Sequence, residues 1–141
     1  MWTLPVAVLL AAAGLAAQES NDGVRSIREG VFSEKQVRRG RRIYEERCQS
    51  CHLIEQFTAS TFLKSWQGQP VHALFSLVRK TMPEDNPGNL KRREYAEVLA
   101  FIFNLNKIPA GETDMKKDDA TLKQILIESP ATEGGGNTEI D

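Results

Sequence analysis

The chain has 141 residues, 40% of them hydrophobic, and a formal net charge of −1, which fits a single folded domain of ordinary size. A charge so close to zero, with no recognisable base-stacking module, argues against nucleic-acid binding. The charge is uneven, because residues 18–107 carry 15 lysines and arginines against 11 acidic residues, whereas residues 108–141 carry 3 against 8.

The first 17 residues are predicted to be a secretory signal peptide. They carry no charged side chain, the run from Leu4 to Ala17 is almost wholly apolar, and Gly14 and Ala16 have the small-residue spacing that a signal peptidase accepts. A membrane anchor needs ~20 apolar residues, more than this run offers. We therefore expect a periplasmic or otherwise exported protein without a stable membrane span after cleavage.

Three further segments complete the predicted organisation. Residues 18–32 show no apolar periodicity and are expected to be a flexible lead-in. Residues 33–128 are expected to form the folded domain. Residues 129–141, with three consecutive glycines, are expected to be a disordered tail.

The first predicted helix begins after Ser33 and runs to about Arg47. Ser33 and Gln36 have the form of a capping box, in which each side chain bonds to the backbone of the other residue. Glycine inside a helix costs ~1 kcal/mol relative to alanine. Gly40 therefore predicts that another helix crosses this one at close range.

Cys48, Cys51 and His52 form a Cys-x-x-Cys-His motif directly after this helix. Two thiols at this spacing, followed by an imidazole, are typical of covalent haem c attachment, with the histidine as proximal iron ligand. A disulfide or a thioredoxin-like redox pair is the alternative interpretation. These are the chain's only cysteines, so one haem is expected.

The segment after the motif leads to a methionine. One or two helical turns are predicted over residues 61–66, and Pro70 suits the first turn of the next helix. That helix repeats apolar residues at helical spacing and should end near Lys80 or Thr81, because Pro83 disfavours helical backbone at the preceding residue. Met82 is therefore predicted to lie on a loop in an extended conformation.

The remaining elements are also predicted to be helical. The strongest helix covers about residues 91–106, where Val98, Phe101, Ile102 and Leu105 repeat at helical spacing. A short last helix is expected to begin at Asp119 and to carry Leu122, Ile125 and Leu126. No convincing strand is apparent, so the predicted fold class is all-α.

Met82 is the predicted second iron ligand. Met115 lies in a charged segment that is unsuited to an apolar pocket, and His72, off the buried helix face, is the runner-up. Thioether ligation raises the reduction potential and leaves no site for substrate at iron, which favours an electron carrier over an enzyme. If Met82 is only core packing, the open position would allow peroxidase-like or gas-binding chemistry. Trp66 is predicted either to close the pocket and bond a haem propionate, or to pack in the core.

Taken together, these residues resemble a class I monohaem cytochrome c over residues 36–127. The elements that carry the resemblance are Gly40-x-x-Ile43-Tyr44 before the haem motif, Leu63-x-x-Trp66, Thr81-Met82-Pro83, Pro87-Gly88, and Tyr95-Ala96-Glu97-Val98 with the helix that follows. The chain is similar in particular to the cytochrome domains of quinoprotein alcohol dehydrogenases.

This resemblance implies an arrangement, partners and a function. The first and last core helices would cross near the haem, with Gly40 and Tyr44 against Val98 and Phe101. The chain would carry single electrons from a donor such as a quinoprotein dehydrogenase to an oxidase or another cytochrome. Its apolar pocket wall would include Leu53, Trp66, Leu74 and Phe75.

The chain departs from this family directly after the haem motif. Such cytochromes usually have a proline there whose carbonyl holds the second nitrogen of the proximal histidine, and residues 53–69 contain no proline. The partner that orients the His52 ring is therefore not identified from the sequence.

Overall fold

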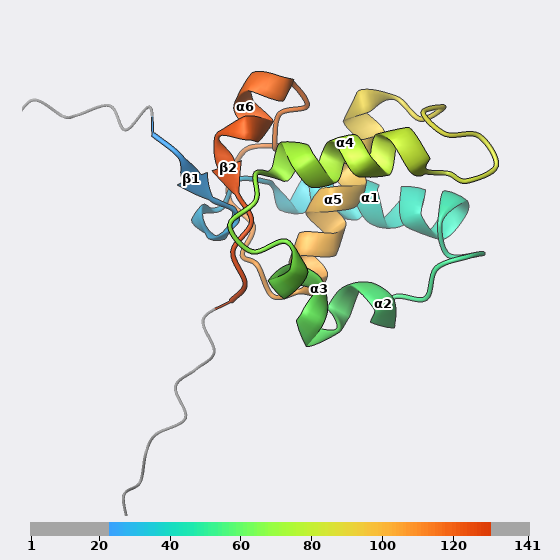
Figure 1. Cartoon of the computed structure of the whole chain (residues 1–141), viewed down its shortest axis with the longest axis horizontal. Helices are drawn as coiled ribbons and strands as arrows, with labels where there is room; N and C mark the ends of the chain where they lie inside the picture. The colour runs from blue at the N-terminus through green and yellow to red at the C-terminus, as the bar shows by residue number, and fades with distance from the viewer. Residues whose placement is uncertain (1–22, 131–141) are drawn as a thin grey trace, which may run out of the picture.

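The computed structural model describes residues 23–130, which are mostly helical, in agreement with the all-α prediction (Figure 1). The helices are the 3-10 helix Ile27–Glu29, α1 (Glu34–Arg47), α2 (Glu55–Thr58), α3 (Ser60–Ser65), α4 (Val71–Thr81), α5 (Arg92–Leu105) and α6 (Asp119–Lys123). The signal peptide predicted at residues 1–17 lies outside the described residues, as does the predicted tail 129–141 apart from residues 129 and 130. The backbone N–H of Ser129 donates a 2.8 Å hydrogen bond to the side-chain oxygen of Gln67. Within residues 23–130, none of the helices is both long enough and apolar enough to cross a membrane.

The contact between α1 and α5 is the centre of the fold, and Gly40 lies in it. A β-carbon on Gly40 would lie 1.8 Å from the carbonyl oxygen of Glu97 and 3.0 Å from Cβ of Phe101. One turn further along α1, the Tyr44 ring packs 5.5 Å from that of Phe101. The close approach predicted at Gly40 is thus confirmed, although the backbone of Glu97, and not Val98, is what Gly40 meets.

Helix α4 packs its apolar stripe against α5. Val71, Leu74 and Phe75 are buried, and Phe75 packs edge-on against Tyr95 with ring centroids 6.2 Å apart. Pro70 lies one position earlier than predicted, as the residue that caps the helix and not within its first turn. The helix ends at Thr81, as predicted.

Residues 23–32, the described part of the lead-in expected to be flexible over residues 18–32, differ from that expectation. Ile27 and Phe32 are fully buried. The short strand β1 (Arg25–Ser26) pairs in parallel with β2 (Ile125–Leu126), so the expectation of no strand is also wrong. Within residues 23–32, the strand has two residues and the 3-10 helix three, which is too short for either to show a helical or strand periodicity in the sequence.

Two predicted helix caps differ in detail. The Ser33 hydroxyl accepts a hydrogen bond from the backbone N–H of Gln36, as predicted. The Gln36 side chain, however, does not return to Ser33: its amide exchanges hydrogen bonds of 3.0 and 2.7 Å with the backbone of Met115. Helix α6 is capped by Asp118, one residue before the predicted Asp119, and ends at Lys123, so Ile125 and Leu126 belong to β2.

Candidate functional site

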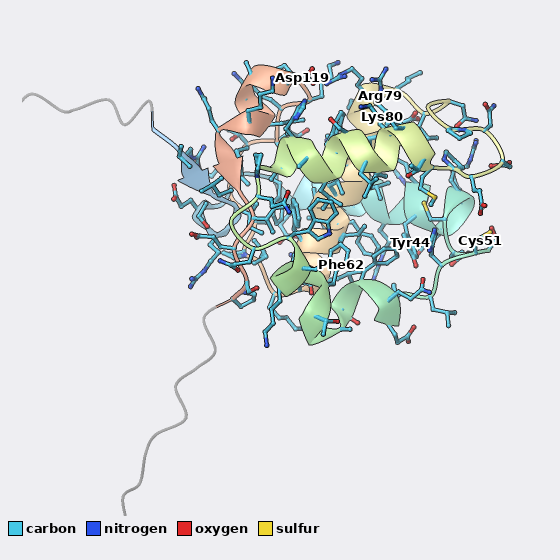
Figure 2. All side chains as sticks on the ribbon, in the orientation of Figure 1. Tyr44, Cys51, Phe62, Arg79, Lys80 and Asp119 are labelled. Atoms are coloured by element: carbon cyan, nitrogen blue, oxygen red, sulfur yellow. The ribbon has the colours of Figure 1, made fainter. Side chains whose placement is uncertain are left out.

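An apolar cavity of about 260 Å³ opens beside the α1–α5 contact. The cysteine motif, the helices that follow it and the end of α4 all contribute to its wall. Its aromatic and aliphatic lining includes Tyr44, Phe57, Phe62, Trp66, Leu74 and Val98. In Figure 2, Cys51 lies at the outer edge of the molecule, with Tyr44 and Phe62 further inside.

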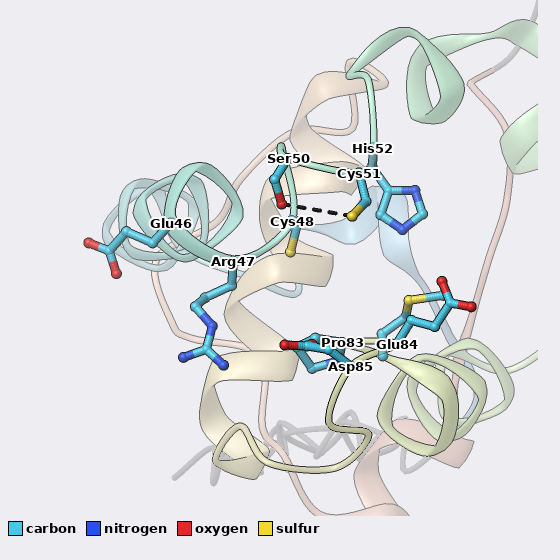
Figure 3. Close-up of a pocket in the computed structure, with 10 residues that line it drawn as sticks. Glu46, Arg47, Cys48, Ser50, Cys51, His52, Pro83, Glu84 and Asp85 are labelled. Carbon is cyan, nitrogen blue, oxygen red and sulfur yellow. Dashed lines mark hydrogen bonds between the residues drawn. The ribbon is translucent and has the colours of Figure 1, made fainter.

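A second, wider hollow of about 680 Å³ lies at the mouth of this cavity. Figure 3 shows Cys48, Cys51 and His52 on one side of it, and the loop with Pro83, Glu84 and Asp85 on the other. Cys48, His52 and Met82 line both hollows, while charged side chains are confined to the outer one: Glu46, Arg47, Glu84 and Asp85. The predicted anchoring and ligand residues are thus brought together where an apolar interior meets a charged rim.

The cysteine motif forms a tight turn on the end of α1. The backbone N–H groups of Cys51 and His52 both donate to the Cys48 carbonyl, at 3.1 and 2.9 Å. The hydroxyl of Tyr44, which is buried in α1, donates a 2.7 Å hydrogen bond to the carbonyl oxygen of His52. Both thiols and the imidazole are therefore fixed to α1 by one compact turn.

The state of the two thiols bears on the alternatives to haem attachment. Cys48 and Cys51 are both free in this structure, and not joined as a disulfide. Burial raises the pKa of the Cys48 thiol, and the nearby charge of Arg47 offsets this only in part. A thioredoxin-like nucleophile needs a lowered thiol pKa. The raised pKa of Cys48 is therefore the opposite of what such a nucleophile requires.

Met82 faces these residues from the loop after α4. Its backbone is extended, with φ −125° and ψ 150°, as predicted. The hydroxyl of Tyr95 donates a 2.8 Å hydrogen bond to its carbonyl oxygen, and its N–H donates to Val78 at 2.8 Å. The backbone N–H and carbonyl of Met82 are thus both held by hydrogen bonds, to α4 and α5 respectively, and Met82 lines the same cavity as His52.

The rival ligands are placed elsewhere. His72 does not line the cavity: its Nε2 lies 3.6 Å from an Asp119 carboxylate oxygen and 3.4 Å from the Ser76 hydroxyl. Met115 is absent from the cavity wall, as expected, although it is 4% exposed and packs in the core. Of the chain's histidines and methionines, those at the cavity within residues 23–130 are His52 and Met82.

The predicted pocket wall is correct in part. Trp66 and Leu74 line the cavity. Leu53 is 68% exposed, because its side chain leaves the motif turn on the solvent side, and Phe75 turns into the core against Tyr95. Phe57 and Phe62 were not anticipated; they pack edge-on with ring centroids 5.5 Å apart. They lie on the short helices α2 and α3, which are too brief to show periodicity.

The ring of His52 has two neighbours on α2. Its Nδ1 lies 3.2 Å from the side-chain oxygen of Gln56, and its centroid lies 5.5 Å from that of Phe57. The contacts of this ring, which the sequence did not identify, therefore come from the helix that follows the motif.

The chemistry of this donor set fits a c-type haem. Two free thiols are available for thioether bonds, an imidazole and a thioether are available as axial ligands, and aromatic and aliphatic side chains surround them. The apolar lining suits a porphyrin face, and the charged rim suits its solvent-exposed edge.

Comparison with known proteins agrees with this chemistry. Residues 35–102, just under half of the chain, match the family described as Cytochrome C oxidase, cbb3-type, subunit III. No curated protein and no solved structure matches the chain. The matched segment runs from α1 through most of α5 and contains Cys48, Cys51, His52 and Met82. This match supports a c-type cytochrome that carries electrons and binds haem c covalently. The match does not show the predicted similarity to the cytochrome domains of quinoprotein dehydrogenases.

Proposed function

We propose that this protein is an exported monohaem cytochrome c that passes single electrons from a dehydrogenase donor to an oxidase or another cytochrome. The observation that carries the proposal is that Cys48, His52 and Met82 line the same apolar cavity. A quinoprotein dehydrogenase is our preferred donor, because three segments resemble the cytochrome domains of such enzymes: Met82-Pro83, Asn86-Pro87-Gly88 and Glu94-Tyr95-Ala96. An oxidase acceptor accords with the matched family, which is described as an oxidase subunit.

Each residue of the site has a distinct role in this proposal. Cys48 and Cys51 hold the haem through thioether bonds, and His52 and Met82 bind its iron. When bound, haem supplies a one-electron ferric–ferrous couple. The neutral, soft sulfur of Met82 favours the ferrous state, and ligands on both faces limit rearrangement between oxidation states. Trp66 closes the inner end of the pocket and is our candidate donor to a propionate.

The partner would dock at the mouth of the site. Cys51 is exposed there, so the haem edge beside it would lie close to a docked protein. Arg47 lines the rim, and Arg79 and Lys80 lie at the end of α4 that leads to the Met82 loop (Figure 2). These cations would steer the acidic parts of a partner surface toward the haem edge, beside the rim carboxylates of Glu46, Glu84 and Asp85. Such steering weakens as salt screens it.

The first experiment is a pyridine haemochrome spectrum of protein made in a host that attaches haem outside the cytoplasm. We expect c-type bands at one haem per chain, their loss in a variant with both cysteines replaced by serine, and a reversible one-electron titration. Export is tested by expressing the full chain and asking whether the protein recovered from the periplasm has lost its N-terminal segment. A purified protein without c-type bands would favour the thiol redox or disulfide interpretation instead.

A further inference from the structure

Gln56 is the residue whose side chain meets the imidazole of His52 on the side away from the iron-binding nitrogen. The 3.2 Å separation between His52 Nδ1 and Gln56 Oε1 is within hydrogen-bond range for N–H···O. We propose that Gln56 is a positioning residue, whose amide oxygen accepts the Nδ1 proton and so fixes the tautomer and rotation of the imidazole. The inference rests on the proposed function, because it assumes that Nε2 binds haem iron.

The backbone that carries Gln56 is held from both sides. Its N–H donates to the Leu53 carbonyl at 3.1 Å, which ties the start of α2 to the motif turn. At the next residue, the carbonyl of Phe57 accepts a 2.7 Å hydrogen bond from the side chain of Asn106, directly after α5. Gln56 therefore projects from a short helix fastened both to the motif and to the core.

The other contacts of His52 leave the ring rotation to Gln56. Tyr44 fixes the backbone carbonyl of His52 at 2.7 Å, and so sets where the side chain begins. Phe57 lies beside the ring at a tilt of 57°, which limits the space without selecting between the two ring nitrogens. Only a polar contact distinguishes Nδ1 from Nε2, and Gln56 Oε1 is the polar contact that the structure gives this ring.

The chemistry of the acceptor has a consequence for the redox couple. A hydrogen bond from Nδ1 makes the other nitrogen a stronger electron donor to a metal, and the effect grows with the negative charge of the acceptor. A neutral amide oxygen orients the imidazole but adds little to the basicity of Nε2, so the ferrous state stays favoured. A carboxylate at the same position would favour the ferric state.

Two substitutions at Gln56 test the proposal in opposite directions, measured on the haem-loaded protein at neutral pH. Gln56→Leu removes the acceptor, and we expect a higher reduction potential and at least tenfold faster exchange of the Nδ1 proton, followed by nitrogen NMR of the reduced protein. Gln56→Glu keeps an acceptor, and we expect a lower potential with the proton still protected. Gln56 is exposed, so neither change should prevent folding.

Thr58 on the same helix supplies the matched control. Thr58→Glu adds the same charge to an exposed position without a contact to the ring, and it should lower the potential less than Gln56→Glu does. The inference would be overturned if Gln56→Leu matched wild type in potential and proton exchange, and Gln56→Glu lowered the potential no more than Thr58→Glu does. The proposed function would still stand in that case, provided that the variants carry covalent haem. Wild-type protein without covalent haem would overturn both.

Discussion

Arg39 and Glu97 form an ion pair inside the α1–α5 contact, with Nε of Arg39 2.5 Å from Oε1 of Glu97. The Glu97 side chain is 1% exposed, and Arg93, one turn earlier on α5, reaches the same oxygen at 3.4 Å. On its other side, Arg39 pairs with Asp114. A carboxylate this deeply buried depends on its cations, so removing one partner is expected to cost more than neutralising the pair.

Replacing Arg39 with leucine should lower the free energy of unfolding by about 2–3 kcal/mol. Breaking a fully buried ion pair would cost more, but the Arg39 side chain is 29% exposed. Adding Glu97→Gln should then recover part of the loss, because a neutral amide no longer needs the cation. Denaturant unfolding of the single and double variants measures both, with Arg42→Leu on the exposed side of α1 as control. A double variant as unstable as the two single losses added together would contradict this coupling.

Asp114 should make stability sensitive to acid. Burial raises the pKa of its carboxyl, but hydrogen bonds from Ser33 and Arg39 and the charges of Arg39 and Lys35 outweigh this and hold the pKa below its usual value. A carboxyl with a lowered folded-state pKa stabilises the protein above its unfolded pKa, about 3.9, and this stabilisation is lost as pH falls through the folded value.

We therefore expect Asp114→Asn to be less stable than wild type at pH 7, and to lose less stability than wild type as the pH falls below about 4. Thermal unfolding followed from neutral to acidic pH checks this. Glu112→Gln removes a charge two residues away and should keep the wild-type slope. Identical acid slopes for Asp114→Asn and wild type would rule out this role.

Gly40→Ala is expected to destabilise the protein, even though alanine is the better helix former by ~1 kcal/mol. The added β-carbon would overlap the Glu97 carbonyl, which is backbone and can move only with α5. Overpacking costs typically about 1–3 kcal/mol and occasionally more, and a 1.8 Å approach to backbone belongs at the upper end of that range. After the propensity gain is subtracted, the net loss should be about 2 kcal/mol. The melting temperature relative to Arg42→Ala measures it, and a variant as stable as that control would show that the helices can separate without cost.

Much of the fold could be predicted from the sequence where the physical signal is local and repeated. The cap at Ser33, the apolar stripe of α4 and its end before Pro83 follow from hydrogen bonding, periodicity and proline sterics. The packing of residues 23–32 could not, because Ile27 and Phe32 are buried by contacts with distant segments. Gln36 shows the same limit, since its partner is the backbone of Met115, 79 residues away.

The site follows the same division. Cys48, Cys51 and His52 could be predicted as a haem anchor because that chemistry restricts both residue type and spacing. Met82 could be predicted as a ligand because Pro83 places it on a loop. Phe57 and Gln56 were missed because α2 is a single turn, and a glutamine four residues after a histidine is not distinctive by itself. Only the placement of α2 against Asn106 gives these side chains a role.

Tyr95 should control how firmly Met82 stays in place. Tyr95→Phe removes the 2.8 Å hydrogen bond to the Met82 carbonyl, worth about 1 kcal/mol, which corresponds to about a fivefold gain in the affinity of ferric protein for added imidazole. Tyr44→Phe is the matched control, because it removes the equivalent 2.7 Å bond to the His52 carbonyl on the opposite side. Optical titration distinguishes them, and equal affinities in the two variants would contradict a specific role for Tyr95.

Carbon monoxide binding to the ferrous haem-loaded protein shows whether His52 and Met82 together leave no open position at the iron. Wild type and Met115→Leu, which retains a thioether at position 82, should resist carbon monoxide at neutral pH, whereas Met82→Leu should form the adduct rapidly. Rapid adduct formation by wild type would contradict the account, since it would show an open sixth position and favour peroxidase-like or gas-binding chemistry over electron transfer.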